Sequence, residues 1–264
     1  MRLAAALLSA LPAPAWGFVP AVGAWCNSGP ELCARRTARH PMRAGFKMLA
    51  SVAEPAVQGQ DPGEMFDVYF PPSKGLAVLD EPPKPAGIRK PRRVVHSEGE
   101  WHRAVHIWLF NDKGELVLQK RSPHKDTFPN MWDVSVGGHM TSGDSSLETA
   151  IKETSEELGL SCQASDFVFL FTVATSARGS TPGHGDFVCN EFKDLYLLRY
   201  TGDLEALSFS DDEVSDVKWV PMDVLEAKLI AQDPEFIPRP KHYTEAFFRA
   251  LRREVEACRS TSTE

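Results

Sequence analysis

Three glutamates are spaced so that their carboxylates would share one face of a helix: Glu153, Glu156 and Glu157. Like charges at this spacing repel by about 0.2–0.5 kcal/mol per pair, and the helix macrodipole disfavours anions near its C-terminal end. Lys152 alone does not neutralise them. The three carboxylates therefore predict a bound cation, and hard oxygen ligands favour Mg²⁺ or Mn²⁺. The alternative is a solvated acidic face without an ion.

The residues on either side predict where this helix begins and ends. Ser145, followed three residues later by Glu148, has the pattern of a capping box, which places the helix start there. Gly159 fits a C-terminal cap. Apolar residues recur at helical spacing between these caps, so the face opposite the glutamates is expected to pack on a core.

The elements around the helix predict one α+β domain. We expect strands at residues 66–70, 104–110, 115–120, 133–136, 167–174, 187–200 and 217–220, and helices at 145–158, 222–229 and 242–258. Residues 111–114, Asn-Asp-Lys-Gly, predict a hairpin turn. Four prolines within residues 80–92 predict an extended arm without regular structure over most of that segment.

Composition excludes several classes of protein. The chain has 264 residues, of which 42% are hydrophobic and 25% charged, so it is neither collagen-like nor wholly disordered. Five cysteines without a CxxC pair argue against a disulfide framework and a zinc knuckle. A net charge of −7 argues against a nucleic-acid partner. The longest apolar run, residues 3–11, is too short to span a bilayer, so we expect no stable membrane association.

The N-terminal segment differs in charge from the rest of the chain. Residues 1–53 hold six basic residues and one acidic residue, a net charge of +5, so the remaining 211 residues carry −12. Arg2, the following apolar run and the small residues at positions 15 and 17 predict a signal peptide over residues 1–17. Residues 18–63 are expected to be a transit-like presequence and linker, because they are first rich in arginine and then small and polar.

The two N-terminal segments together resemble the bipartite presequences of algae with secondary plastids. This resemblance implies delivery to the plastid through the secretory route, with secretion or a cytoplasmic location as alternatives. An N-terminal arm with one strand is expected at residues 64–98.

Residues 138–160 resemble the Nudix box. The matching positions are Gly138, Glu153, Glu156, Glu157, Gly159 and Leu160, and the departures are Asp144, Lys152 and Thr154. The resemblance implies a Nudix hydrolase domain over residues 99–258, with an α/β/α sandwich and a mixed sheet. It also implies that the three glutamates and the Gly138 carbonyl hold Mg²⁺ against the diphosphate of a small-molecule substrate. One of these glutamates, or Glu213 from another loop, would act as the general base, although Glu213 also fits an ordinary acidic turn.

A longer resemblance, from about residue 66 to residue 251, is to the isopentenyl-diphosphate isomerase-like branch of the superfamily. It rests on the segments WHRAVHIWLF, GELVLQKR, WDVSVGGH, NEFKDLYLL and DDEVSDVKWV. The resemblance implies a second metal site with His96, His102, His139 and Glu191 as ligands. For each histidine, the alternative is a structural residue held by hydrogen bonds.

Two departures from the isomerases favour hydrolysis. The isomerases use a cysteine to move a proton at carbon, and this chain has Gly137 at that position. Cys189 could replace that cysteine, but it lies on a different predicted strand. Isomerases also have a degraded hydrolase box, whereas all three glutamates are present here. An isomerase and a metal-binding module without catalysis remain the alternatives.

The sequence defines the substrate-binding residues less clearly than the metal ligands. Lys120 and Arg121 follow a predicted strand and are candidates to contact phosphate, and Trp132 is a candidate to line a pocket. A solvated strand end and an aromatic core residue are the alternatives. The sequence leaves open a nucleoside diphosphate derivative and a prenyl diphosphate as substrates.

Overall fold

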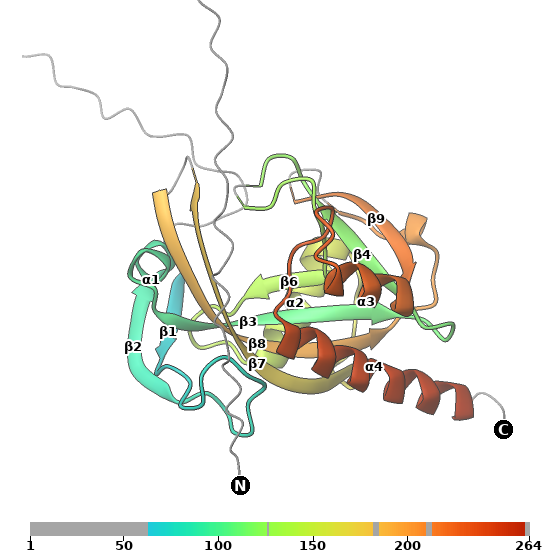
Figure 1. Cartoon of the computed structure of the whole chain (residues 1–264), viewed down its shortest axis with the longest axis horizontal. Coiled ribbons are helices and arrows are strands. Elements are labelled where there is room, and N and C mark those ends of the chain that lie inside the picture. Colours follow the sequence, from blue (N-terminus) through green and yellow to red (C-terminus); the bar gives the residue numbers. More distant parts are fainter. Residues whose placement is uncertain (1–62, 126, 182–184, 210–212, 262–264) are drawn as a thin grey trace, which may run out of the picture. The chain divides into compact units, whose positions relative to one another are not determined.

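The computed structural model describes residues 63–125, 127–181, 185–209 and 213–261 (Figure 1). The predicted signal peptide and nearly all of the predicted presequence lie outside these residues. The described part contains a nine-stranded mixed sheet and four α-helices, which confirms the α+β prediction. Among the described residues, no helix is both long and apolar enough to cross a membrane.

Strand β3 (Trp101–Phe110) is the centre of the sheet. It pairs in parallel with β8 (Gly185–Arg199) and antiparallel with β6 (Val136–His139), which makes the sheet mixed. The N-terminal strands β1 (Met65–Tyr69) and β2 (Pro85–Pro91) continue the sheet beyond β3. The remaining strands are β4 (Glu115–Arg121), β5 (Trp132–Asp133), β7 (Phe167–Thr181) and β9 (Val214–Pro221). β7 pairs with β8, and β4 pairs with β5 and β9.

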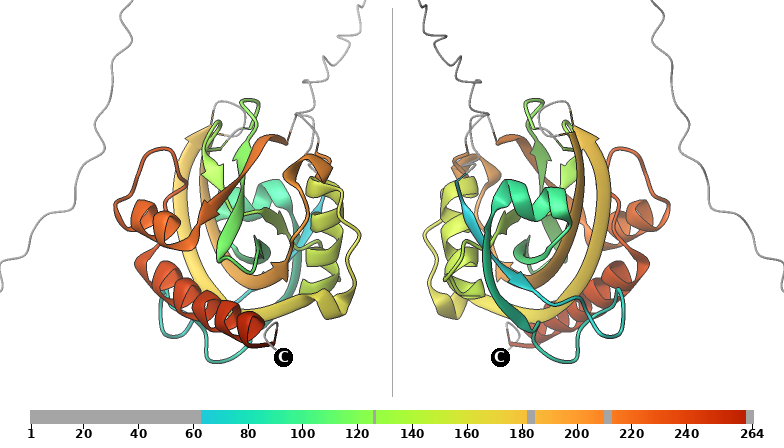
Figure 2. Two further views of the ribbon diagram at one scale, coloured as in Figure 1. Left: turned by 90° about the vertical axis from the view of Figure 1, so that its right-hand side faces the viewer. Right: turned by 90° about the vertical axis from the view of Figure 1, so that its left-hand side faces the viewer.

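Two hydrophobic clusters cover the opposite faces of the sheet, because side chains alternate along β3. Ile107 and its alternate neighbours pack with helix α2 (Ser146–Leu158), whereas Trp108 packs with helix α4 (Lys241–Thr261). Helix α3 (Met222–Ile230) belongs to the second cluster. Figure 2 shows α2 on one side of the strands and α3 and α4 on the other. This arrangement confirms the α/β/α sandwich with a mixed sheet.

The predicted helix over residues 145–158 is confirmed together with its caps. The Ser145 hydroxyl accepts a hydrogen bond from the Glu148 amide at 3.3 Å, and the Glu148 carboxylate accepts one from the Ser145 amide at 2.9 Å. Gly159 ends the helix in the left-handed region, with a φ of 68°. The hairpin turn at residues 111–114 is also confirmed, because the Gly114 amide donates to the Asn111 carbonyl at 2.9 Å.

The prediction of an irregular arm over residues 80–92 is wrong. Residues 85–91 form β2, and helix α1 (Arg92–Glu98) follows directly. β2 is an edge strand that pairs only with β1, and its prolines lie at its two ends, where a missing amide donor is tolerated. Pro91 then serves as the N-cap of α1, with a φ of −59° that suits a helix start.

Two other predicted boundaries need correction. The single strand expected at residues 133–136 is divided into β5 and β6, and Ser135 lies between them. The Ser135 hydroxyl accepts from the Leu109 amide at 2.8 Å and donates to the Val117 carbonyl, so this residue bridges β3 and β4. β7 also runs past residue 174 to Thr181, and β8 begins at Gly185 rather than at residue 187, because the two backbones stay paired as a two-stranded extension.

Candidate functional site

The C-terminal half of α2 lies against the glycine-containing strand β6. Gly138 pairs with Val105 in the sheet, and its α-carbon faces the Glu153 side chain. A β-carbon at Gly138 would overlap the Glu153 carboxyl group. Glycine is therefore required at position 138 for the close approach of this carboxylate to the strand.

Glu157 is the most enclosed of the three glutamates. Its Oε2 accepts hydrogen bonds from the Gly137 amide at 3.2 Å and from the Gln119 side chain at 3.0 Å. Burial raises the pKa of Glu157 to about 8, and the neighbouring charge of Glu153 adds to this effect. Gly137 and Gln119 thus fix the position of the Glu157 carboxyl group. Ionising this group is unfavourable when no cation is present.

Glu153 and Glu156 complete the acidic group. Burial raises the pKa of Glu153 to about 7, with a further contribution from the charge of Glu156. The Glu156 side chain is exposed. The three glutamates therefore lie on the C-terminal half of α2, and carboxylate oxygens are ligands that suit a hard divalent cation such as Mg²⁺.

Glu213 approaches this acidic group from the start of β9. Its carboxylate forms an ion pair with Lys125, and its backbone carbonyl accepts a hydrogen bond from the Ser122 amide at 3.1 Å. The charge of Glu213 also contributes to the raised pKa of Glu157. The predicted base candidate is thus held beside the glutamates of α2.

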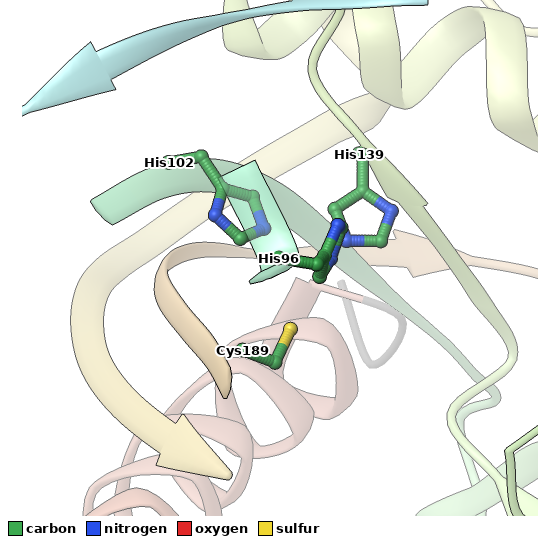
Figure 3. A group of neighbouring side chains, drawn as sticks. All are labelled: His96, His102, His139 and Cys189. Carbon is green, nitrogen blue, oxygen red and sulfur yellow. The ribbon is translucent and has the colours of Figure 1, made fainter. Parts of the chain in front are cut away.

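A second group of potential ligands lies at the N-terminal ends of β3 and β8. His96 on α1, His102 on β3, His139 on β6 and Cys189 on β8 have ligand atoms that all lie within 4.8 Å of one another. Figure 3 shows the side chains gathered at one point. The sequence predicted the three histidines but did not place Cys189 with them.

Glu191, the fourth ligand expected from the sequence, lies beside this group. Its Oε1 is 3.1 Å from His139 Nε2 and 3.8 Å from His102 Nε2, while its Oε2 is 2.7 Å from the Lys193 ammonium. Cys189 and Glu191 are two residues apart in one strand, so they share a face of the sheet. That spacing was the available signal that Cys189 belongs near the histidines.

The histidine group packs against one aromatic side chain, that of Phe66. The Phe66 ring stacks on His102 and His139 with centroid separations of 5.3 and 5.1 Å. Burial lowers the pKa of His102 to about 4 and that of His139 to about 3, so both rings are neutral near pH 7. Burial also raises the pKa of the Cys189 thiol well above its usual value.

The predicted substrate residues have structural contacts of their own. Arg121 donates from Nε to the Thr127 carbonyl at 3.0 Å and pairs with Asp133 at 3.5 Å. The ring of Trp132 has the Lys218 ammonium 3.7 Å from its centroid and that of Lys120 at 5.7 Å. These contacts place Lys120 and Trp132 together, and they give Arg121 a role in holding the loop after β4.

A small pocket lies beside Trp132, between the sheet and the α3 region. Its lining includes Trp108, Leu118, Leu225 and Phe236, and its cavity volume is about 10 Å³. Small-molecule sites typically occupy roughly 300–1,000 Å³. The pocket therefore does not by itself account for a substrate site at Trp132.

Comparison with known proteins gives one family match and several relatives. The family model described as NUDIX domain matches residues 100–240. Nudix hydrolase 3 of Arabidopsis thaliana is 38% identical over 164 residues, which cover 61% of this chain and 21% of that protein. The chain thus spans about a fifth of that relative's length. An uncharacterized Nudix hydrolase of Clostridium acetobutylicum is 33% identical, and the match covers 57% of this chain and 71% of the relative.

The chain is similar to isomerases and to solved structures as well. Isopentenyl-diphosphate Delta-isomerase of Klebsiella pneumoniae is 29% identical over 163 residues, which cover 62% of this chain and 84% of the isomerase. The crystal structure of DR0079 from Deinococcus radiodurans matches with a TM-score of 0.46 and 25% identity, covering 71% of this chain and 99% of that one.

Proposed function

Because this chain belongs to the Nudix family, we propose that it hydrolyses the diphosphate linkage of a small-molecule substrate with Mg²⁺, or Mn²⁺, as the metal. The family match and the relatives named Nudix hydrolase support a Nudix-type hydrolase. The observation that carries the proposal is the pair of partly buried carboxylates, Glu153 and Glu157, held against the glycines of β6.

Four groups are the proposed metal ligands: the carboxylates of Glu153, Glu156 and Glu157 and the carbonyl of Gly138. They fit a divalent cation because desolvation and neighbouring negative charge raise the pKa values of Glu153 and Glu157, and a positive charge offsets the cost of ionising these two carboxyl groups. When bound, Mg²⁺ draws negative charge from the diphosphate and favours the ionised form of a water molecule.

The chain's own residues position these groups. The Gly137 amide and the Gln119 side chain fix the Glu157 carboxylate in one orientation. Lys125 forms an ion pair with Glu213 and so holds its carboxylate in place. Glu213 and the α2 glutamates remain the candidates for the general base. A Glu213→Gln variant that lowers kcat without weakening Mg²⁺ binding would assign that role to Glu213.

Isomerisation is the second candidate function, because the three histidines expected from the isomerase resemblance do come together. Gly137 argues against it, since this position has no side chain to transfer a proton at carbon. The retained glutamates of α2 favour hydrolysis. A metal-binding module without catalysis is the third possibility.

The substrate and the location are also proposals. We propose a nucleoside diphosphate derivative or a prenyl diphosphate as the substrate, with Lys120 as a candidate contact for its phosphates. The sequence pattern of residues 1–63 is the support for delivery to the plastid through the secretory route. Secretion and a cytoplasmic location are the alternatives.

One screen distinguishes the three functions. The full chain is incubated with nucleoside diphosphate derivatives and prenyl diphosphates, with and without Mg²⁺, and the products are identified. A hydrolase releases phosphate or a monophosphate only when the metal is present, an isomerase moves a double bond and releases nothing, and a binding module does neither. The Glu157→Gln variant is the control, because loss of this ligand should remove Mg²⁺-dependent release.

A further inference from the structure

We propose that strand β1 is part of the hydrolase site, because Glu64 and Asp67 position the loop of residues 141–143 that joins β6 to α2. Glu64 immediately precedes β1, and Asp67 lies within it. The family model matches residues 100–240, so both residues lie outside the matched domain. This role rests on the hydrolysis proposed above, and it makes Glu64 and Asp67 positioning residues of that site.

The loop connects two proposed parts of the metal site. Gly138, whose carbonyl is a proposed ligand, belongs to β6, and α2 carries the three glutamates. Residues 140–145 are the whole connection between this strand and this helix. Within it, the Asp144 amide donates to the Thr141 carbonyl at 3.0 Å, so the chain turns there. Because the connection is short, a shift of this turn moves Gly138 relative to the glutamates.

Asp67 holds the middle of the loop with both oxygens of its carboxylate. Oδ1 accepts a hydrogen bond from the Ser142 hydroxyl at 2.7 Å, and Oδ2 accepts one from the Gly143 amide at 3.1 Å. Gly143 has a φ of 96°, in the left-handed region that favours glycine. A carboxylate that accepts from two donors fixes the orientation of the turn as well as its position.

Two further contacts come from the residues that precede Asp67. The Glu64 carboxylate accepts a hydrogen bond from the Thr141 hydroxyl at 2.8 Å, and the Met65 carbonyl accepts one from the Ser142 amide at 2.7 Å. Glu64, Met65 and Asp67 thus form a clamp on the loop. Each of the three loop residues donates at least one hydrogen bond to this clamp.

Glu64 is itself fixed by α1, close to the acidic group. Its Oε2 accepts a hydrogen bond from Arg92 Nη1 at 2.9 Å, and its carbonyl accepts one from the Arg92 amide at 2.7 Å. The charge of Glu64 raises the pKa of Glu153, and the charge of Arg92 lowers it. The clamp therefore lies beside a proposed metal ligand and not at a remote part of the surface.

The clamp is not required to keep α2 folded on the sheet. Ala150 and Leu158 are fully buried in the core cluster on that side, and the helix has its own N-terminal cap. Without the clamp, side-chain packing alone would set the position of α2 relative to Gly138. Since a misplacement of about 1 Å can cost roughly 100-fold in rate, we expect losses in metal affinity and rate while the fold is kept.

The test measures metal binding and hydrolysis separately in the full chain. Mn²⁺ binding is followed by electron paramagnetic resonance without substrate, and only the Mn²⁺ that excess Mg²⁺ displaces is counted. Hydrolysis is measured in Mg²⁺ on the diphosphate that the wild type cleaves fastest in the screen described above. Asp67→Ala should bind Mn²⁺ roughly 10-fold more weakly and lower kcat roughly 10–100-fold, as expected when a residue that orients a metal site is removed. Its melting temperature without metal should stay within about 5 °C of the wild type.

Further variants show whether Asp67 acts through the loop. Arg89→Gln is the matched control, because it removes the 3.5 Å ion pair of Asp67 with Arg89 and leaves the loop contacts in place. Its kcat and Mn²⁺ affinity should stay within about twofold of the wild type. Ser142→Ala should lose less than Asp67→Ala, and the double variant should lose no more than Asp67→Ala alone, because the Ser142 hydroxyl has then already lost its partner.

If Asp67→Ala does not fold, Asp67→Asn replaces it. The single side-chain oxygen of asparagine can replace only one of the two carboxylate oxygens that accept from the loop, so this variant should show the same changes to a smaller extent.

Three results would overturn the role of the clamp. They are wild-type Mn²⁺ affinity and kcat in the Asp67 variants, a lower melting temperature with both of these values unchanged, or losses that multiply in the double variant. A failure of the hydrolysis proposal is distinguishable, because the wild type would then cleave no diphosphate while the effect of Asp67→Ala on Mn²⁺ binding would still be measured.

Discussion

The partly buried carboxylate of Glu157 makes the stability of the fold depend on pH, and one substitution can isolate this effect. Its pKa is raised from the usual 4.5 to about 8, so the folded chain binds a proton that the unfolded chain has released over this range. Stability from this group is therefore fully present below pH 4.5 and is lost as the pH rises toward 8. Glu157→Gln removes the ionisation while keeping the shape of the side chain.

The expected magnitude follows from the same values. At pH 7 the carboxyl group is still protonated in the folded chain, although pH 7 is about 2.5 units above its pKa in the unfolded chain. Each of these units corresponds to about 1.4 kcal/mol of free energy. The glutamine variant should thus be more stable than the wild type by on the order of 3 kcal/mol at pH 7 without metal, and by less than about 1 kcal/mol at pH 5. The amide oxygen of glutamine can still accept from Gly137 and Gln119.

The assay is urea unfolding of wild type and variant at several pH values between 5 and 8, with a chelator present. Glu156→Gln is the matched control, because it neutralises an exposed carboxylate one residue away and should change stability by no more than about 0.5 kcal/mol. In Mg²⁺, Glu157→Gln should lower kcat by roughly 100-fold or more. A stability difference that does not grow with pH would refute the buried, raised-pKa carboxylate.

The other predictions concern the glycines of β6 and the N-terminal segment. Gly138→Ala should lower kcat by roughly 100-fold, because its methyl group displaces the Glu153 carboxyl. Gly137→Ala, measured in the same assay, should lower kcat far less. Gly137→Cys should fold with a stability change under about 1 kcal/mol, measured by urea unfolding, because its β-carbon meets no atom closer than 3.4 Å. A reporter fused to residues 1–50 should reach the algal plastid, and deletion of residues 2–17 should leave it in the cytosol, as seen by microscopy.

An isomerase assay of the wild type and of two variants tests the choice between hydrolysis and isomerisation. The wild type should not isomerise isopentenyl diphosphate in an assay that follows the double bond. Clear isomerisation that is abolished by Cys189→Ser but not by Glu157→Gln would move the chemistry to the histidine group.

The local sequence determined the parts of this protein that depend on neighbours within a turn or two. The capping box of Ser145 and Glu148, the cap at Gly159 and the common face of the three glutamates all follow from helical spacing, and the structure has each of them. The hairpin at residues 111–114 is equally local. The resemblance of residues 138–160 to the Nudix box also predicted the fold, because the box includes the glycine of strand β6 as well as helix α2.

Only the tertiary structure decided the features that depend on distant segments. Residues 85–91 form a strand because β1 offers a free edge, which no proline count reveals. Cys189 joins the histidines because β8 pairs in parallel with β3, which places Glu191 opposite His102 and Cys189 two residues before Glu191. The pKa of Glu157 rises because sheet and helix exclude water from its carboxylate. Strand pairing and desolvation are set by the packing of remote elements, whereas spacing along the chain fixes only which side chains share a face.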